Sequence, residues 1–235
     1  VRKFVIKSSK YIFMSTMFNT LLKLPLFQGL SPEDFTNILG RVKLHFIKYK
    51  AGEVIAKSNT PCKELVFLLK GEVDKQTTPE NGLFTYIETL KTPFLIEPEA
   101  LFGMNPHFKA TYTAQTDVSI MSIDKMLVLK ELLKYDVFRL NYVNSVSNRA
   151  QSLYSRLWET SSSGTEKKII HFMTTYAEKL EGEKTIMIKM EDLAEIIDDT
   201  RLNVSRILNE LQHKGLIELR RKVIYIPEIN KLIQS

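Results

Sequence analysis

The sequence predicts an α+β protein in three parts: an antiparallel β-roll, a long helix, and a C-terminal unit of three helices with a β-hairpin. Residues 42–123 consist of short runs in which apolar and polar residues alternate, separated by clusters of Gly, Asn, Pro and Thr. This pattern is typical of antiparallel strands. Residues 124–159 read as a long helical stretch, and residues 165–235 show three helical patterns and two short apolar runs. A length of 235 residues with 44% hydrophobic content suffices for packed cores.

The composition restricts the classes of function. The first ten residues carry four Lys and Arg where a signal peptide would be apolar, and no run approaches the roughly 18 apolar residues of a spanning helix. We therefore expect a cytoplasmic protein that does not contact the membrane. A single cysteine, Cys62, excludes an internal disulfide and, within one chain, iron–sulfur or cysteine-based zinc sites. We assign no function to residues 1–13, and Met14 and Met17 follow as candidate start residues.

Residues 18–123 are predicted to form the β-roll domain, with a short helix before its strands. Ser31 is a typical N-cap, Pro32 suits the first helical position, and acids follow, so this helix should run to about Leu39. Asn81-Gly82 is the strongest hairpin signal in the chain. Further turns are expected at residues 51–52, 70–72 and 104–106. A closed double sheet of this kind leaves an interior pocket.

The long helix, assigned to residues 124–160 with a break near Tyr135-Asp136, carries an apolar seam. Its members alternate in steps of three and four: Val143, Val146, Ala150, Leu153 and Leu157. Such a seam fits packing against the protein's own sheet as well as pairing with a second copy. Polar residues on the other faces favour a parallel homodimer, and Thr160–Gly164 reads as a hinge.

Residues 165–235 have the pattern of a winged helix-turn-helix. Helices are expected at about 166–179, 190–197 and 200–214, and strands at 216–219 and 223–226. In this motif one helix braces a second helix, whose N-terminal part enters the major groove of DNA. The apolar inner surface is expected to consist of Leu193, Ala194, Ile197, Val204, Ile207, Leu208 and Leu211.

Candidate DNA contacts lie at the start of the third helix and at the hairpin tip. Thr200 can cap the helix and leaves Arg201, Asn203, Ser205 and Arg206 facing outward. Arginine can bind guanine and asparagine can bind adenine through paired hydrogen bonds. At the tip, Arg220, Arg221 and Lys222 suit phosphate or minor-groove contact. An ordinary solvated surface is the alternative. The net charge of +6 comes mainly from residues 1–50, so it is the local basic stripe at residues 200–222 that favours double-stranded DNA as the partner.

Several segments together resemble the Crp/Fnr family of bacterial transcription regulators. They span residues 26–226 and comprise Leu26–Ser31, Tyr49–Ile55, Leu65–Val73, Asp192–Ile197 and Thr200–Leu208. The resemblance implies a cyclic-nucleotide-binding-like β-roll, a dimerising central helix and a winged helix that binds a palindromic site. It also makes RNA polymerase a candidate partner.

The departures from this family are informative. Leu202 stands where the family's recognition helix often has glutamate, so the preferred DNA site should differ. In the pocket, Glu97 stands where members that bind cyclic AMP have glycine, and Pro98 where they have glutamate. Phe108 and Lys109 replace the family's phosphate-binding arginine and its neighbour, and a shifted alignment also involves Glu99. We therefore expect an effector other than cyclic AMP, either a small acid or an apolar metabolite, at a pocket that includes Glu97, Glu99, Phe108 and Lys109.

Two other classes of function remain as alternatives. A metal enzyme of the cupin type needs clustered ligands, whereas His45, His107, His171 and His213 are scattered along the chain. A haem is not favoured either, because a lone histidine in a sheet is more often a core or surface residue. A member that binds a partner protein and has lost DNA binding is the second alternative. We expect no catalytic residue, no metal site and no bound cofactor.

Overall fold

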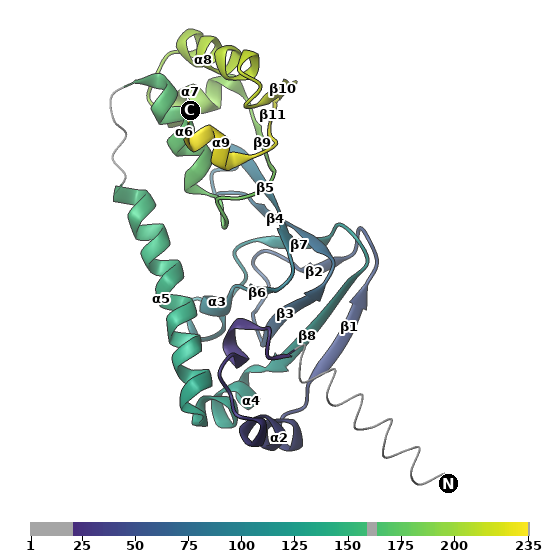
Figure 1. The fold of residues 1–235 in the computed structure, drawn as a ribbon. Coiled ribbons are helices and arrows are strands. Elements are labelled where there is room, and N and C mark those ends of the chain that lie inside the picture. Colours follow the sequence, from purple (N-terminus) through teal and green to yellow (C-terminus); the bar gives the residue numbers. More distant parts are fainter. Residues whose placement is uncertain (1–20, 159–163, 235) are drawn as a thin grey trace.

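The computed structural model describes residues 21–158 and 164–234. A β-roll lies beside one long helix, and a C-terminal unit sits at the far end of both (Figure 1). Residues 1–20, which include the candidate start residues, lie outside the described part of the chain, as does most of the predicted hinge. The elements up to the long helix are η1 (Pro25–Phe27), α2 (Pro32–Arg41), β1 (His45–Tyr49), β2 (Val54–Ala56), β3 (Glu64–Lys70), β4 (Glu72–Thr77), β5 (Phe84–Lys91), β6 (Phe94–Ile96), α3 (Pro98–Phe102), β7 (Thr111–Ala114), β8 (Val118–Asp124), α4 (Lys125–Lys130) and η2 (Leu132–Lys134).

The roll consists of two antiparallel layers, as the alternating runs indicate. One sheet has the order β1-β8-β3-β6, and the strands β5, β4, β7 and β2 form the other layer. Side chains from both layers meet in a core that includes Phe67, Met121 and Tyr112, all completely buried. The hairpin predicted at Asn81-Gly82 joins β4 to β5, with Thr77 opposite Tyr86. Ser31 caps α2 by accepting the backbone N–H of Asp34, also as predicted.

Gly71 makes the tight turn between β3 and β4, and we expect its replacement by alanine to destabilise the roll. Its φ is +94°, and an added Cβ would lie 2.6 Å from the carbonyl oxygen of Asp117. Such strain costs about 1–3 kcal/mol of unfolding free energy. Gly40 in α2 offers a matched control, since its Cβ would meet no heavy atom within 4 Å. Gly40→Ala should stabilise by up to about 1 kcal/mol. Urea denaturation of both variants tests this, and equal changes would contradict it.

The long helix α5 (Asp136–Trp158) starts after the break predicted near Tyr135-Asp136. Its first half packs on the roll through Phe138 and Tyr142. The hydroxyl of Tyr142 donates to the carbonyl of Pro98 at 2.6 Å, and the side-chain amide of Asn141 donates to the carbonyl of Gln28 at 2.8 Å. The helix is thus fixed along one side of the roll, next to α3.

The C-terminal unit is a winged helix-turn-helix. Its elements are α6 (Thr165–Thr175), β9 (Lys184–Ile188), α7 (Met190–Ile196), α8 (Arg201–His213), β10 (Glu218–Arg220), β11 (Val223–Ile226) and α9 (Ile229–Ile233). All seven apolar residues predicted for the inner surface are buried. The first predicted strand begins at Glu218 rather than Leu216, because the backbone N–H of Leu216 bonds to the carbonyl of Leu211 and continues the turn after α8.

The predicted first helix of this unit is too long. The pattern extends to Lys179, whereas α6 ends at Thr175. The physical reason is a competing partner for the backbone: the N–H groups of Glu178 and Lys179 donate to the carboxylate of Glu88 at 2.7 and 2.8 Å. These contacts turn the chain away from the helix and into the loop that leads to β9.

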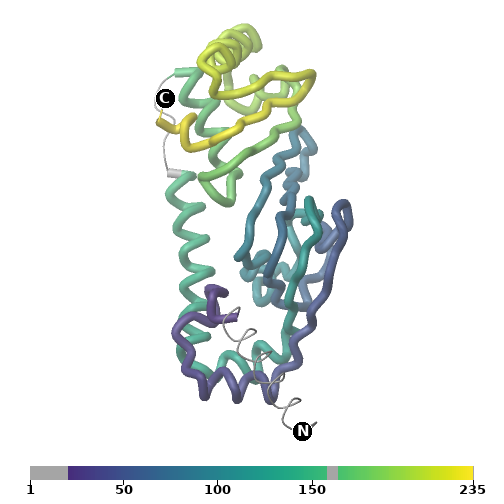
Figure 2. The backbone as a smooth tube through the Cα atoms, turned by 45° about the vertical axis from the view of Figure 1, so that its right-hand side comes forward, coloured from purple at the N-terminus to yellow at the C-terminus, as the bar shows by residue number. Residues whose placement is uncertain are grey.

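Strand β9, which the patterns above do not predict, connects the roll to the C-terminal unit. It pairs with β5 on one side and β11 on the other, so a seven-stranded sheet runs through both regions in the order β10-β11-β9-β5-β4-β7-β2. Figure 2 shows β5 extending from the roll up to the C-terminal unit. Opposite each other in this pairing, Glu88 and Lys184 form an ion pair of 3.1 Å, with side chains 1% and 0% exposed. Phe84 and Tyr86 of β5 belong to the core of the C-terminal unit.

Candidate DNA-binding surface and effector cavity

Helix α8 begins with a well-formed cap. The hydroxyl of Thr200 accepts the backbone N–H of Asn203 at 3.2 Å. Just before it, the carboxylate of Asp199 accepts bonds from the Thr165 hydroxyl, the Asn203 side-chain amide and the Thr200 N–H. These three hydrogen bonds lower the pKa of Asp199 to about 2, and the bond from the Thr165 hydroxyl has the largest effect. The side chain of Asn203 therefore serves the cap and is half-buried, although the sequence places it on the outward face.

The two arginines of α8 point into solvent. Arg201 pairs with Glu191 at 3.1 Å and Arg206 with Glu210 at 2.8 Å, and all four side chains are between 46% and 70% exposed. Exposed ion pairs of this kind contribute less than about 1 kcal/mol, so both guanidinium groups are available to a polyanion. Ser205 is half-buried beside them. Leu202, which lies between the two arginines in the sequence, is 81% exposed.

The hairpin tip between β10 and β11 is basic and exposed, as predicted. Arg220 pairs with Glu218 at 3.1 Å, and Arg221 and Lys222 are exposed. A groove of about 240 Å³ separates this hairpin from α7 and α8 and is lined in part by Arg220 and Lys222. The C-terminal unit therefore carries cationic side chains both on its capped helix and on its hairpin.

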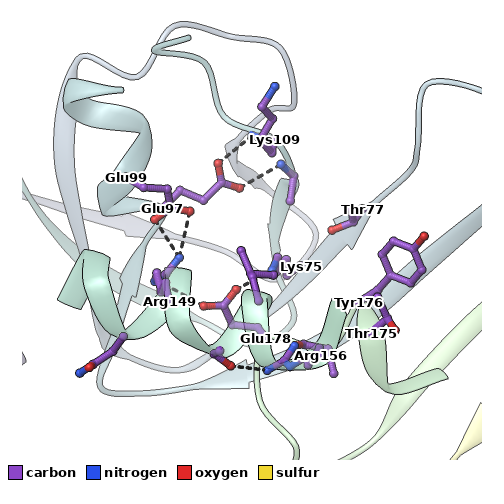
Figure 3. A pocket seen from close by; sticks show the side chains of 15 residues that line it. Lys75, Thr77, Glu97, Glu99, Lys109, Arg149, Arg156, Thr175, Tyr176 and Glu178 are labelled. Atoms are coloured by element: carbon purple, nitrogen blue, oxygen red, sulfur yellow. Dashed lines mark hydrogen bonds and ion pairs between the residues drawn. The ribbon is translucent and has the colours of Figure 1, made fainter. Parts of the chain in front are cut away.

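A cavity of about 450 Å³ lies between the roll, α5 and the end of α6. Figure 3 shows its lining side chains coming from β4, the β6–α3 segment, α5 and the loop after α6. Three predicted pocket residues line it, namely Glu97, Glu99 and Lys109. The ammonium of Lys109 is turned away from the other charged groups (Figure 3). Phe108, the fourth, is 7% exposed, packs in the core of the roll and is absent from the lining.

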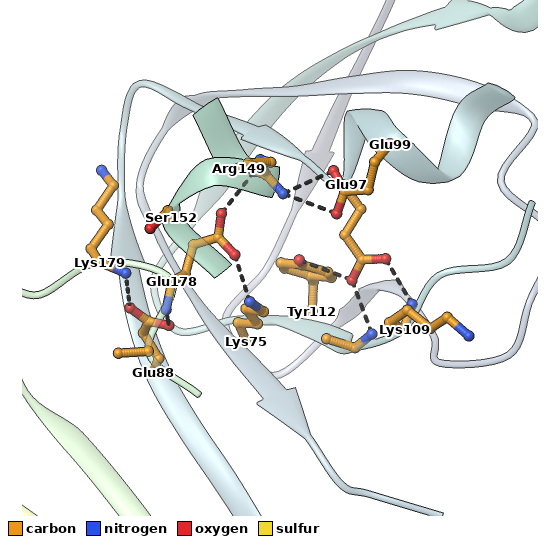
Figure 4. Close-up of polar contacts among 12 residues, drawn as sticks. Lys75, Glu88, Glu97, Glu99, Lys109, Tyr112, Arg149, Ser152, Glu178 and Lys179 are labelled. Carbon is orange, nitrogen blue, oxygen red and sulfur yellow. Dashed lines mark hydrogen bonds and ion pairs between the residues drawn. The ribbon is translucent and has the colours of Figure 1, made fainter. Parts of the chain in front are cut away.

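Ion pairs that the sequence analysis missed dominate one wall of the cavity. Arg149 of α5 binds the carboxylate of Glu99 at 3.1 Å, that of Glu178 at 3.0 Å and the carbonyl of Leu95 at 2.9 Å (Figure 4). Lys75 of β4 binds the second oxygen of Glu178 at 2.7 Å. Burial raises the pKa of Glu178, but Lys75 and Arg149 outweigh it and lower the pKa overall. No local pattern marks these residues, because their partners lie far apart in the sequence.

Glu97 also lines the cavity and is 3% exposed. It accepts the backbone N–H of Lys109 at 2.7 Å, the N–H of Ala110 at 2.9 Å and the hydroxyl of Tyr112 at 3.1 Å (Figure 4). Burial raises its pKa, and the hydrogen bonds from the Lys109 and Ala110 amides oppose that shift. The backbone of Glu97 is left-handed, with φ +31° and ψ 61°.

Within residues 21–158 and 164–234, no three His, Cys, Asp or Glu side chains come close enough to hold a metal ion. In the same part of the chain no helix combines the length and apolar character needed to cross a bilayer. The single cysteine, Cys62, is buried, and its pKa is raised to about 11, mainly by burial.

Comparison with known protein families identifies two domains in the chain. Residues 46–135 match the model of the cyclic nucleotide-binding domain, and residues 167–235 match the Crp-like helix-turn-helix domain. No curated protein matches the chain. Among solved structures, the catabolite activator protein of Thermus thermophilus is 19% identical, with 89% of this chain and 97% of that chain covered and a TM-score of 0.51, and it shares the fold.

Two further solved structures resemble the chain more distantly. DNR from Pseudomonas aeruginosa is 18% identical, over 93% of this chain and 96% of its own, with a TM-score of 0.46. The c-di-GMP responsive global regulator CLP of Xanthomonas campestris is 15% identical, over 84% of this chain and 99% of its own, with a TM-score of 0.48.

Proposed function

Because the chain belongs to the Crp/Fnr family of transcription regulators, we propose that it binds a palindromic DNA site as a homodimer in the cytoplasm, under the control of a small effector. Its Crp-like helix-turn-helix makes it a DNA-binding regulator, and its roll is a sensor domain of the cyclic nucleotide-binding type. Contact with RNA polymerase is part of this proposal. The observation that carries it is a capped helix with two exposed arginines, next to a basic hairpin in the same unit.

The start of α8 supports base recognition. Arg201 and Arg206 can each form two parallel hydrogen bonds to guanine in the major groove. The exposed Leu202 offers an apolar side chain for the methyl group of thymine, which glutamate could not provide. The hairpin residues Arg220, Arg221 and Lys222 suit contacts to phosphate, which add affinity without sequence information. The proposed division of roles is therefore base reading by α8 and anchoring by the hairpin.

An exposed apolar stripe along α5 supports the homodimer. Val143, Leu153 and Leu157 are 52%, 57% and 71% exposed, and Ala150 between them is exposed as well. The remaining seam residue, Val146, is half-buried against the core of the roll. Pairing of this stripe with the same stripe of a second copy would remove these side chains from water. It would also place two copies of α8 for half-sites about 34 Å apart.

We expect Leu153→Asp to produce a monomer that binds DNA weakly. A carboxylate at the centre of the stripe would have to be buried without a partner in the dimer. A monomer has only one DNA-binding unit, so its affinity for DNA with two half-sites should fall at least about 100-fold, because binding to the second half-site is then no longer intramolecular. Sedimentation velocity and fluorescence anisotropy measure both effects. Asn144→Asp, at an exposed position of α5 outside the seam, is the control and should remain dimeric.

The position of the cavity supports effector control. Its lining combines the roll, α5 and the loop after α6, so a ligand there would contact the sensor, the proposed dimer helix and the DNA-binding unit together. Such a ligand acts only through different affinities for two arrangements of these parts. Pro98 and Phe108 at the family's nucleotide-binding positions support an effector other than cyclic AMP.

Selection of bound DNA from a random pool, with and without small molecules from a cell extract, tests the proposed function. The expected result is an inverted repeat whose half-site centres are about 10 base pairs apart, with a yield that changes in the presence of the effector. A single half-site, or no enrichment at low ionic strength, would contradict the proposal. Stoichiometric metal in the purified protein would instead support the cupin-type enzyme.

A further inference from the structure

The donors around Glu97 form a compact cradle for an oxyanion. Two successive backbone N–H groups, of Lys109 and Ala110, reach different oxygens of the carboxylate at 2.7 and 2.9 Å, and the hydroxyl of Tyr112 reaches one of them at 3.1 Å. Backbone N–H groups only donate, so the group that fills this space must present at least two acceptor oxygens in one plane. Carboxylates and the faces of phosphate and sulfate meet that requirement.

We propose that this cradle is an oxyanion-binding site whose ligand is supplied by the chain itself, and that the Glu97 carboxylate keeps free phosphate out of it. The Glu97 carboxylate accepts all three hydrogen bonds, and Glu97 also lines the cavity. The cradle therefore adjoins the 450 Å³ space where an external ligand would arrive.

The backbone at Glu97 supports the internal-ligand interpretation. A left-handed conformation costs a non-glycine residue about 1–2 kcal/mol, and the next residue is Pro98. A side chain is therefore held at a position that would suit glycine better, and the bonds from the Lys109 and Ala110 amides and the Tyr112 hydroxyl offset that strain. Glycine at this position would remove the strain and the carboxylate together, leaving the donors free.

The experiment uses Glu97→Gly in the full chain, with inorganic phosphate as the probe and sodium chloride at matched ionic strength as the reference. We expect phosphate to bind this variant at least about tenfold more tightly than the wild type, because its charge-assisted bonds replace those of the carboxylate. At a tenfold excess over the dissociation constant, its melting temperature should rise by about 3–6 °C. The amide signals of Lys109 and Ala110 should shift during the titration in a nuclear magnetic resonance spectrum.

Glu99→Ala is the matched control, because it removes a carboxylate from the same cavity and changes the net charge equally, but leaves the cradle filled. It should respond to phosphate as the wild type does. If Glu97→Gly is poorly folded, phosphate should restore its circular dichroism spectrum where chloride does not. The proposal is overturned if Glu97→Gly responds to phosphate no more than to chloride, if the wild type binds phosphate equally well, or if Glu99→Ala gains the same response.

Discussion

Replacing Lys184 with methionine should lower the free energy of unfolding by about 3–5 kcal/mol, since it leaves a buried carboxylate without its counter-charge. The ammonium of Lys184 lies 3.1 Å from Glu88, and both side chains are almost completely buried. It also donates to the carbonyl of Glu181 at 2.6 Å, which loses that partner as well. The methionine keeps most of the side-chain volume, so the loss reports the charge rather than a cavity. Chemical denaturation followed by circular dichroism measures the difference.

Lys91→Met is the matched control, at the end of β5, the strand that carries Glu88. Lys91 pairs with Glu72 at 3.3 Å, but its side chain is 74% exposed, so removal of this pair should cost less than about 1 kcal/mol. Similar losses in the two variants would mean that water reaches the Glu88–Lys184 pair, and would contradict the burial of the junction between β5 and β9.

Arg206→Ala should weaken binding to the selected DNA site by about 10- to 100-fold, corresponding to about 1–3 kcal/mol, and should relax the base preference at one position of each half-site. Its exposed ion pair with Glu210 is too weak to retain the guanidinium against guanine. Arg221→Ala at the hairpin tip should instead weaken binding to all sequences alike. It should also reduce the slope of log affinity against log salt concentration by about one. Fluorescence anisotropy over a series of site variants and salt concentrations separates the two effects.

Lys214→Ala serves as the control for these DNA measurements. It removes one positive charge from the residue just after α8, at the opposite end of the helix from the cap, where Lys214 pairs with Glu166 at 3.0 Å. Base preference should therefore be unchanged in this variant. An identical loss of preference in Lys214→Ala and Arg206→Ala would show that net charge, and not the start of α8, determines the DNA sequence bound.

Local patterns predicted the parts of this molecule that local chemistry determines. The caps at Ser31 and Thr200 follow from side chains that bond to the backbone three residues later. The hairpin at Asn81-Gly82 and the break before Asp136 likewise depend on neighbouring residues. The basic tip of the wing is exposed because nothing else in the described part of the chain covers a two-residue turn between β10 and β11.

The parts that the sequence did not predict depend on contacts between distant segments. The residues next to Lys184 in the sequence give no sign that it is buried. It is buried because Glu88, which lies 96 positions earlier in the sequence, is opposite it in the sheet and forms an ion pair with it. The short run Lys184–Ile188 becomes a strand only because β5 and β11 flank it. In the cavity, Lys75 and Arg149 meet at Glu178, and no spacing rule connects residues from a strand, a helix and a loop.

Strand β5 belongs to both hydrophobic cores, with Leu90 in that of the roll and Phe84 and Tyr86 in that of the winged helix. Neither core can lose this strand without exposing apolar surface in the other. The sensor and the DNA-binding head consequently form one cooperative melting unit, and a calorimetric scan of the chain should give a single heat-absorption peak in place of the two expected for autonomous modules.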